Sequence, residues 1–248
     1  MPFPRSCRLF LFDLDGTLID SSEDIARALN SGLLKIGRRA LALPDVIRFV
    51  GEGMDVLIRR ALREVTGMEP EAQEIRTVMQ VMLEEYHARP VASSRLYPGV
   101  RETLAALRWA RFGLVSNKTE CLCRRILEAF HLSESFCIVL GSDSLPSRKP
   151  DPAPLLKAMI HCGAQTSETV MVGDSRTDVL AGKAAGIFTC GLSCGFRGRE
   201  ELAVAGCDLI IDSFAQLQEY FVPPSDHHSP ATEHAAPAEG RRAFKDGE

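Results

Sequence analysis

The stretch Arg8-Leu-Phe-Leu-Phe-Asp-Leu-Asp-Gly-Thr17 decides how this chain of 248 residues is organised. Its first five residues form a short apolar run with aromatic content, which is typical of a strand buried on both faces of a parallel sheet. Asp13 and Asp15 follow at once, and Gly16 permits a tight backbone there. Ligands of open parallel sheets bind at the carboxyl ends of strands, so this stretch predicts a site beside Asp13.

Five further apolar runs have the length and composition of buried strands, and helical patterns separate most of them. The expected strands are residues 8–12, 112–116, 136–140, 169–172, 187–192 and 209–211, and the expected helices are 100–109, 121–130, 153–162 and 178–185. Strands that alternate with helices require a parallel sheet covered on both faces. We therefore predict the α/β class, with a doubly wound parallel sheet as the core.

The interval between the first two strands holds about ninety residues, far more than the dozen or so that a simple crossover needs. Three stretches in it have helical periodicity, at residues 22–35, 54–66 and 70–88. We expect a helical cap at residues 19–90, inserted into a core made of residues 1–18 and 91–222. After Val222 large apolar residues become rare, which predicts a disordered tail over residues 223–248.

Composition restricts the possible partners. The formal net charge of −4 provides no general attraction to nucleic acid, and no apolar stretch approaches the roughly 18–20 residues that cross a bilayer. The eight cysteines contain no C-x-x-C pair, so we expect buried thiols in a reducing compartment rather than a zinc site. These features predict a cytoplasmic protein with no membrane or nucleic-acid partner, and they leave the oligomeric state open.

Other polar residues also stand at the ends of expected strands. Ser116 and Asn117 end the second strand, and Asp174 follows the fourth. Lys149 precedes a proline-rich helix start after the third strand. Asp178 lies four residues after Asp174, which would place the two on one helix face. We expect all of these side chains to meet at one edge of the sheet.

So many carboxylates in one place require a cation. Two like charges about 4 Å apart cost roughly 4 kcal/mol at an effective dielectric of 20. Asp13, Asp15, Asp174 and Asp178 would lie close together, and the single charge of Lys149 is too little to neutralise them. A hard divalent ion suits oxygen ligands, and Mg²⁺ is the usual choice beside phosphate.

The same residue types support phosphoryl transfer. A carboxylate beside a metal stays ionised and can attack phosphorus. A second carboxyl group two residues away can protonate the leaving oxygen and then activate water. The hydroxyl groups of Thr17 and Ser116 are candidates for holding the transferring group. These residues predict a small phosphorylated metabolite as the substrate.

Four ordered motifs resemble those of the haloacid dehalogenase-like hydrolases: Asp13-Leu-Asp-Gly-Thr17, Ser116-Asn117, Lys149-Pro150, and Gly173-Asp174 with Asp178. The resemblance implies that Asp13 is the nucleophile and Asp15 the general acid and base. It implies that Ser116, Asn117 and Lys149 contact phosphate. Mg²⁺ would be held by the Asp13 carboxylate, the Asp15 backbone carbonyl and Asp174, with Asp178 in support.

Within this family, Asp20-Ser-Ser22 followed by Phe49-Val-Gly-Glu-Gly53 and Leu57 is similar to the phosphoglycolate phosphatase group. The resemblance therefore favours 2-phosphoglycolate as the substrate. Pyrophosphatases, nucleotidases and sugar-phosphate phosphatases or mutases share most of the pattern and remain alternatives. A non-catalytic phosphate-binding module is the alternative of another class; such a protein would be expected to lack Asp13 or Asp15, and both are present.

Overall fold

The computed structural model describes residues 4–224 of the chain. From residue 225 onward, the segment expected to be a disordered tail lies outside the described residues. Within the described part, no helix has both the length and the apolar character needed to cross a membrane.

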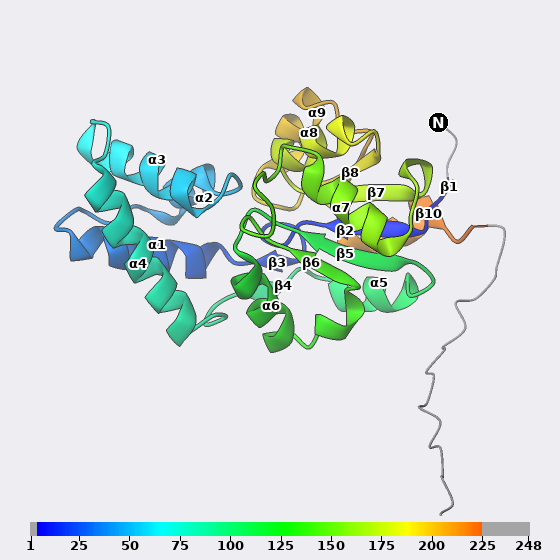
Figure 1. Cartoon of the computed structure of the whole chain (residues 1–248), viewed down its shortest axis with the longest axis horizontal. Coiled ribbons are helices and arrows are strands. Elements are labelled where there is room, and N and C mark those ends of the chain that lie inside the picture. The colour runs from blue at the N-terminus through cyan, green and yellow to red at the C-terminus, as the bar shows by residue number, and fades with distance from the viewer. Residues whose placement is uncertain (1–3, 225–248) are drawn as a thin grey trace, which may run out of the picture.

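Six parallel strands form the central sheet, in the order β6-β5-β2-β7-β8-β9. Their bounds are β2 Leu9–Phe12, β5 Arg111–Val115, β6 Ile138–Leu140, β7 Thr169–Gly173, β8 Phe188–Leu192 and β9 Leu209–Ile211. Each of these strands was expected from its apolar run. Helices cover both faces of the sheet, so the predicted α/β class with a doubly wound sheet is confirmed (Figure 1).

The order of the strands places a crevice at the middle of the sheet. The chain builds outward from β2 to β5 and β6 on one side, and from β7 to β8 and β9 on the other. In the central register Phe12 lies opposite both Leu114 and Val172. The strand order therefore reverses between β2 and β7, and such a switch point is where open α/β sheets bind ligands.

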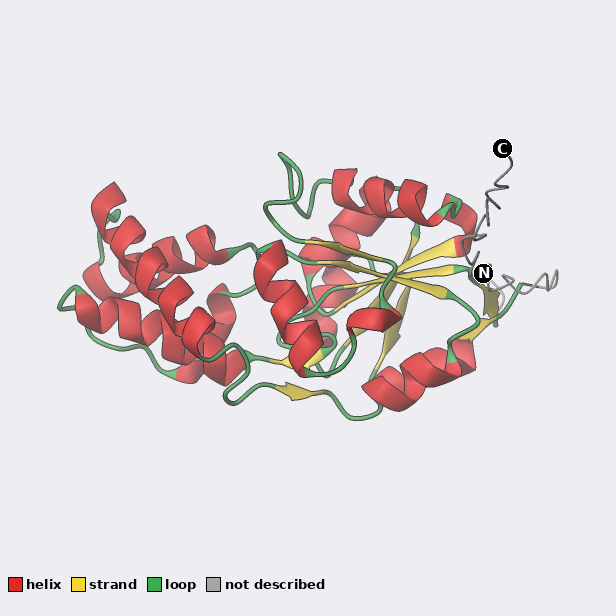
Figure 2. Ribbon diagram, turned by 60° about the horizontal axis from the view of Figure 1, so that its bottom comes forward, coloured by secondary structure: helices red, strands yellow, loops and turns green. Residues whose placement is uncertain are grey.

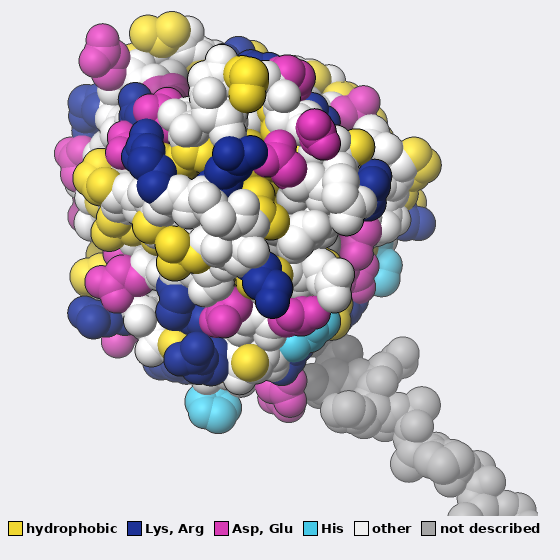
Figure 3. Space-filling model, turned by 90° about the vertical axis from the view of Figure 1, so that its left-hand side faces the viewer, with side chains coloured by type: hydrophobic (Ala, Val, Ile, Leu, Met, Phe, Trp, Pro, Cys, Tyr) yellow, Lys and Arg dark blue, Asp and Glu magenta, His cyan; other side chains and the backbone are white. Residues whose placement is uncertain are grey.

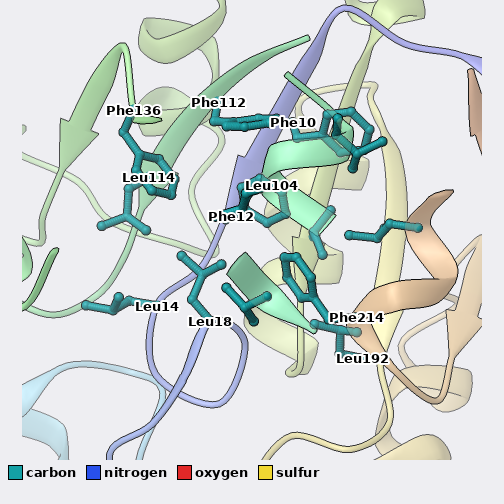
Figure 4. Close-up of a cluster of buried hydrophobic side chains, with 14 of the residues drawn as sticks. Phe10, Phe12, Leu14, Leu18, Leu104, Phe112, Leu114, Phe136, Leu192 and Phe214 are labelled. Carbon is teal, nitrogen blue, oxygen red and sulfur yellow. The ribbon is translucent and has the colours of Figure 1, made fainter. Parts of the chain in front are cut away.

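Alternation along β2 divides the interior of the core into two layers. Phe10 and Phe12 face one side, where they contact Phe112 with ring centroids 6.2 and 5.8 Å apart (Figure 4). Leu9 and Leu11 face the other side, in a separate apolar cluster. All four are fully buried, which accounts for the continuous apolar run of this strand.

Helices pack on each face of this sheet. The face with the phenylalanines is covered by α5 (Val100–Ala106), α6 (Glu120–Ala129) and α10 (Leu217–Tyr220), and the opposite face by α7 (Ala153–Cys162) and α8 (Arg176–Ala184). Helix α9 (Gly198–Val204) packs beside α8. Figure 2 shows the sheet lying edge-on between these layers.

Four helices form a separate body at one end of the molecule (Figure 1). They are α1 (Ser22–Lys35), α2 (Leu43–Phe49), α3 (Met54–Thr66) and α4 (Ala72–Ala88), and they enclose most of a second apolar cluster, to which α6 adds Leu122. We call them the cap. A short antiparallel ribbon of β3 (Ile19–Asp20) and β4 (Arg95–Leu96) joins the cap to the sheet. The expected domain boundaries at residues 18 and 90 stay a prediction.

Several short elements had no recognisable signal in the sequence. Helix α2 has only seven residues, which is shorter than the window of 11–18 residues in which helical periodicity can be recognised. The two-residue strands β1 (Arg5–Ser6) and β10 (Phe221–Val222) pair with each other. Three 3-10 helices occupy Ser133–Ser135, Thr166–Glu168 and Phe214–Gln216.

The surface at the cap end carries charges of both signs (Figure 3). Seen from the cap end, Lys and Arg side chains alternate with Asp and Glu, without a large patch of one sign (Figure 3).

All eight cysteines are free. Four are buried as expected and Cys207 is half-buried, but Cys121, Cys137 and Cys194 are exposed, because they lie on a helix surface or in loops. The expectation that the cysteines are buried is therefore only partly right.

Candidate functional site

The site lies at the carboxyl ends of three strands. Asp13 follows β2, Ser116 follows β5, and Asp174 follows β7. The sheet ladder extends to these residues, because the Asp13 amide donates to the Val172 carbonyl at 3.0 Å and the Ser116 amide to the Leu140 carbonyl at 2.9 Å. The backbone that carries the functional groups is thus continuous with the rigid sheet.

Three buried carboxyl groups meet at this edge. Asp13, Asp174 and Asp178 each place a carboxylate oxygen within 4.8 Å of the others. Burial raises the pKa of Asp13 to about 6; the charge of Lys149 opposes this rise and that of Asp178 adds to it. Burial, followed by the charges of Asp178 and Asp13, holds the pKa of Asp174 well above its ordinary value.

Asp178 reaches the cluster by a different route from the one expected. Helix α8 begins only at Arg176, so Asp174 precedes the helix and does not share a face with Asp178. Ser175 is the N-cap, and Asp178 occupies position N3 of the helix. The two form a capping box, in which Asp178 Oδ2 accepts from the Ser175 amide at 3.1 Å. The first turn of the helix therefore turns this carboxylate back toward the strand end.

Lys149 forms ion pairs with two of these acids. Lys149 Nζ lies 2.6 Å from Asp178 Oδ1 and 2.9 Å from Asp13 Oδ1, and its side chain is 2% exposed. Burial lowers the pKa of Lys149, but the charges of Asp13 and Asp178 outweigh burial and hold it above its ordinary value. Lys149 is therefore a fixed positive charge at the site.

The acidic cluster fits a divalent cation. One lysine cannot balance three carboxylates, and Asp13 Oδ1 accepts no well-directed hydrogen bond within the described part of the chain. The donor set consists of carboxylate oxygens, which suit a hard cation. Gly16 and Gly195 press against Asp174, since a Cβ atom on either would lie 2.3 Å from atoms of its side chain. This packing fixes the direction in which Asp174 points.

Asp15 lies at the same edge, but its carboxylate is outside the acidic cluster. Lys118 Nζ donates to its two oxygens at 2.9 and 2.8 Å, and the Ser21 hydroxyl donates to Oδ1. The expected metal contact through the Asp15 backbone carbonyl stays a prediction.

The remaining candidates occupy different positions. Asn117 Nδ2 donates to the carbonyls of Gly51 and Lys149, both at 2.9 Å, so this amide links the core, the Lys149 loop and the cap. The Ser116 side chain faces the pocket and also accepts from the Lys118 amide at 3.3 Å. Thr17 is fully buried, and its hydroxyl lies 3.5 Å from Asp174 Oδ1, outside the pocket lining.

A cavity of about 60 Å³ opens above these residues. Its floor comes from the core and includes Asp13, Asp15 and Ser116, while its cover comes from the cap and the loop after β8. The cap residues are Ile25, Val50, Gly51, Gly53, Met54, Leu57, Met82 and Tyr86. The polar groups are thus on the core side, and the opposite wall is mainly apolar.

Two arginines of the core hold the cap over this cavity. Arg148 forms a two-pronged ion pair with Asp55 of α3, with N–O distances of 2.8 and 3.0 Å. Arg197 donates to the Arg48 carbonyl at 3.0 Å and to the Val50 carbonyl. Those carbonyls belong to the end of α2, where helical carbonyls lack partners within the helix.

Sequence reasoning missed several residues that line this cavity, among them Tyr86, Lys118, Phe196 and Arg197. Lys118 directly follows Ser116-Asn117, so its place in the motif was an available signal. The others come from helix α4 and from the loop after β8. Nothing in their local sequence indicates that these segments converge on the ends of β2 and β5.

Comparison with known proteins agrees with this arrangement. Residues 10–192 match the haloacid dehalogenase-like hydrolase family. The chain is 39% identical over 213 residues to a phosphoglycolate phosphatase of Pseudomonas fluorescens (strain Pf0-1). The alignment covers 85% of this chain and 78% of that protein. It is also 36% identical over 215 residues to a phosphoglycolate phosphatase of Nitrosospira multiformis. That alignment covers 86% of this chain and 95% of that protein.

A solved structure resembles the whole arrangement. It is the crystal structure of a "predicted phosphoglycolate phosphatase" from Haemophilus somnus 129PT, with a TM-score of 0.81 and 33% identity. The match covers 86% of this chain and 96% of that one. The chain belongs to the haloacid dehalogenase-like hydrolases, and the three relatives described above are named phosphoglycolate phosphatases.

Proposed function

We propose that this protein is a Mg²⁺-dependent phosphatase that hydrolyses 2-phosphoglycolate through an aspartyl-phosphate on Asp13. The observation that carries the proposal is the pairing of two differently held acids at one strand end. Asp13 belongs to the acidic cluster and lies beside Lys149, whereas Asp15 lies beside Lys118. Two carboxyl groups in different environments suit two different chemical roles.

The residues of the site divide the reaction between them. Asp13 would attack phosphorus, while Asp15 would donate a proton to the leaving oxygen and later take one from the hydrolytic water. Lys149 and the hydroxyl of Ser116 would contact the phosphoryl oxygens. Asp13, Asp174 and Asp178 would hold Mg²⁺, which when bound neutralises charge on the phosphoryl group.

Two observations favour a compact substrate. The cavity is small and is covered by the cap through contacts at Asp55 and at the end of α2. The relatives at 36–39% identity are named phosphoglycolate phosphatases. A nucleotide or hexose phosphate would have to hold the cap further from the core than these contacts allow. We also propose that the enzyme acts in the cytoplasm, as its composition predicts.

The test of substrate is a comparison of catalytic efficiency on 2-phosphoglycolate, pyrophosphate, a nucleoside monophosphate and a hexose phosphate. We expect 2-phosphoglycolate to lead by tenfold or more, which is about 1.4 kcal/mol of transition-state binding. Phosphate release would be measured with and without Mg²⁺. A lead for another compound would overturn the substrate assignment, and no release from any compound would point to a phosphate-binding module.

Magnesium is expected to stabilise the protein, and more strongly at pH 7.5 than at pH 5. The pKa of Asp13 is raised to about 6, so the metal-free folded state binds this proton more tightly than the unfolded chain does. The stability contributed by Asp13 is therefore present at low pH and is lost as the pH rises through about 6. Mg²⁺ needs the ionised carboxylates, and protons compete with it below that pH.

The measurement is the melting temperature during a Mg²⁺ titration at both pH values. A concentration of 100 times Kd should add about 2.7 kcal/mol, or roughly 5–10 °C, at pH 7.5. Asp174→Asn should remove most of the rise, whereas Asp45→Asn on the cap surface should keep it. An equal rise at both pH values, or a full rise in Asp174→Asn, would contradict this cation site.

A further inference from the structure

Lys118 is a buried cation that has no role in the phosphoryl transfer proposed above. It lies between β5 and α6, and its side chain is 6% exposed. Its Nζ contacts the two oxygens of Asp15 and lies 5.0 Å from the centre of the Tyr86 ring, which belongs to cap helix α4. Lys118 therefore stands where the core, the proton donor and the cap meet.

The charge of Lys118 is secure at this place. Burial lowers its pKa, but the Asp15 carboxylate, followed by Tyr86, outweighs burial and holds the pKa above the ordinary value. A protonated lysine has three N–H donors. Among the described residues, the two hydrogen bonds that Nζ donates, at 2.9 and 2.8 Å, both go to one group, the Asp15 carboxylate, so the ammonium has capacity for a second anion.

The proposed reaction places part of the substrate beside this ammonium. A proton donor must lie about 2.6–3.2 Å from the oxygen that it protonates. Lys118 Nζ is 2.8 Å from Asp15 Oδ2, so the leaving oxygen would lie at most about 6 Å from Nζ. In 2-phosphoglycolate the carboxylate joins that oxygen through one methylene group, which brings the carboxylate within hydrogen-bond reach of Lys118.

The other cations near the cavity, Lys149 outside its lining and Arg197 within it, are engaged elsewhere. Lys149 is bound between Asp13 and Asp178 in the acidic cluster. Arg197 donates to two backbone carbonyls at the end of α2, so its guanidinium holds the cap. The cap wall that faces the floor is mainly apolar and has no cation of its own in the lining. Lys118 is thus the lining residue best placed to receive a second negative charge.

We propose that Lys118 is the specificity-determining residue of this site, and that it selects phosphate monoesters whose leaving group has a carboxylate one carbon from the ester oxygen. The proposal rests on the proposed function. Its consequence is that a neutral leaving group of the same size is a poor substrate. The Tyr86 ring, whose centre lies 5.0 Å from the ammonium, limits the space for longer leaving groups.

The experiment compares two substrates that differ in the carboxylate alone, 2-phosphoglycolate and 2-hydroxyethyl phosphate. Unaltered protein should favour 2-phosphoglycolate in kcat/KM by ~30-fold or more, because a lost partner leaves a buried charge unpaired. In Lys118→Met this preference should fall to about threefold or less. Lys183→Met, which removes a surface lysine paired with Asp208, is the matched control and should keep the full preference.

Three further outcomes decide between explanations. An equal loss on both substrates in Lys118→Met would mean that Lys118 only positions Asp15, and would overturn the proposal. Loss of the preference in Arg197→Met, with the preference retained in Lys118→Met, would assign the carboxylate to Arg197 instead. If Lys118→Met does not fold, Lys118→Gln keeps a donor to Asp15 without the charge, and it should show the same collapse of preference.

The same assay separates failure of this proposal from failure of the proposed function. Hydrolysis of both substrates with equal efficiency by unaltered protein would overturn the role of Lys118 and leave the phosphatase activity standing. Hydrolysis of neither substrate would overturn the proposed function, and the role of Lys118 with it.

Discussion

Asp13→Asn should lower phosphate release by at least ~10⁴-fold while leaving the protein folded, because an amide cannot accept the phosphoryl group. The substitution keeps the shape of the side chain at the end of β2. It also removes a carboxylate whose pKa is raised to about 6 by burial, so the cost of burying its charge disappears. Lys149 loses one partner but keeps Asp178 at 2.6 Å. We therefore expect a melting temperature within a few degrees of the unaltered protein.

Turnover of 2-phosphoglycolate and the melting curve would be measured together in this variant. Asp45→Asn is the matched control, since Asp45 is a half-buried aspartate of α2 whose side chain pairs only with Arg48 among the described residues. It should retain full activity. A near-normal rate in folded Asp13→Asn would show that another group attacks phosphorus.

The sheet could be predicted because each of its strands is buried on both faces. The apolar run of residues 9–12 is continuous, since Phe10 and Phe12 pack on one side and Leu9 and Leu11 on the other. The acids at the strand ends were predicted for the same reason, since a parallel sheet brings those ends together. The four ordered motifs therefore identified most of the floor of the site.

The cover of the site was beyond prediction because it depends on contacts between distant segments. Helix α2 is too short for a periodic signal, yet its end receives a hydrogen bond from Arg197, in a loop about 150 residues later. The placement of Asp178 depended on where α8 begins, and the capping box at Ser175 fixes that point. Thr17 was expected at the phosphate, whereas its hydroxyl lies toward Asp174.

Asp15→Asn should lower turnover of 2-phosphoglycolate by about 10²–10⁴-fold, the usual contribution of general acid and base catalysis. An alkoxide is a poor leaving group, so loss of the proton donor slows the first step on this substrate. An aryl phosphate releases a stable phenolate and needs the donor far less. The first step on the aryl phosphate should therefore survive in the variant, while hydrolysis of the aspartyl-phosphate stays slow because the water has lost its base.

This difference predicts a burst. Rapid mixing of Asp15→Asn with p-nitrophenyl phosphate should release about one equivalent of nitrophenolate per site, followed by a slow steady rate. Asp20→Asn, five residues further on, is the control and should give no burst, since the Asp20 carboxylate only accepts from Ser22 among the described residues. If Asp15→Asn loses the same factor on both substrates and shows no burst, Asp15 is not the proton donor. The pairing of Asp15 with Lys118 would then serve to hold the strand end in place, and the proton donor would have to be a group on the cap side of the cavity.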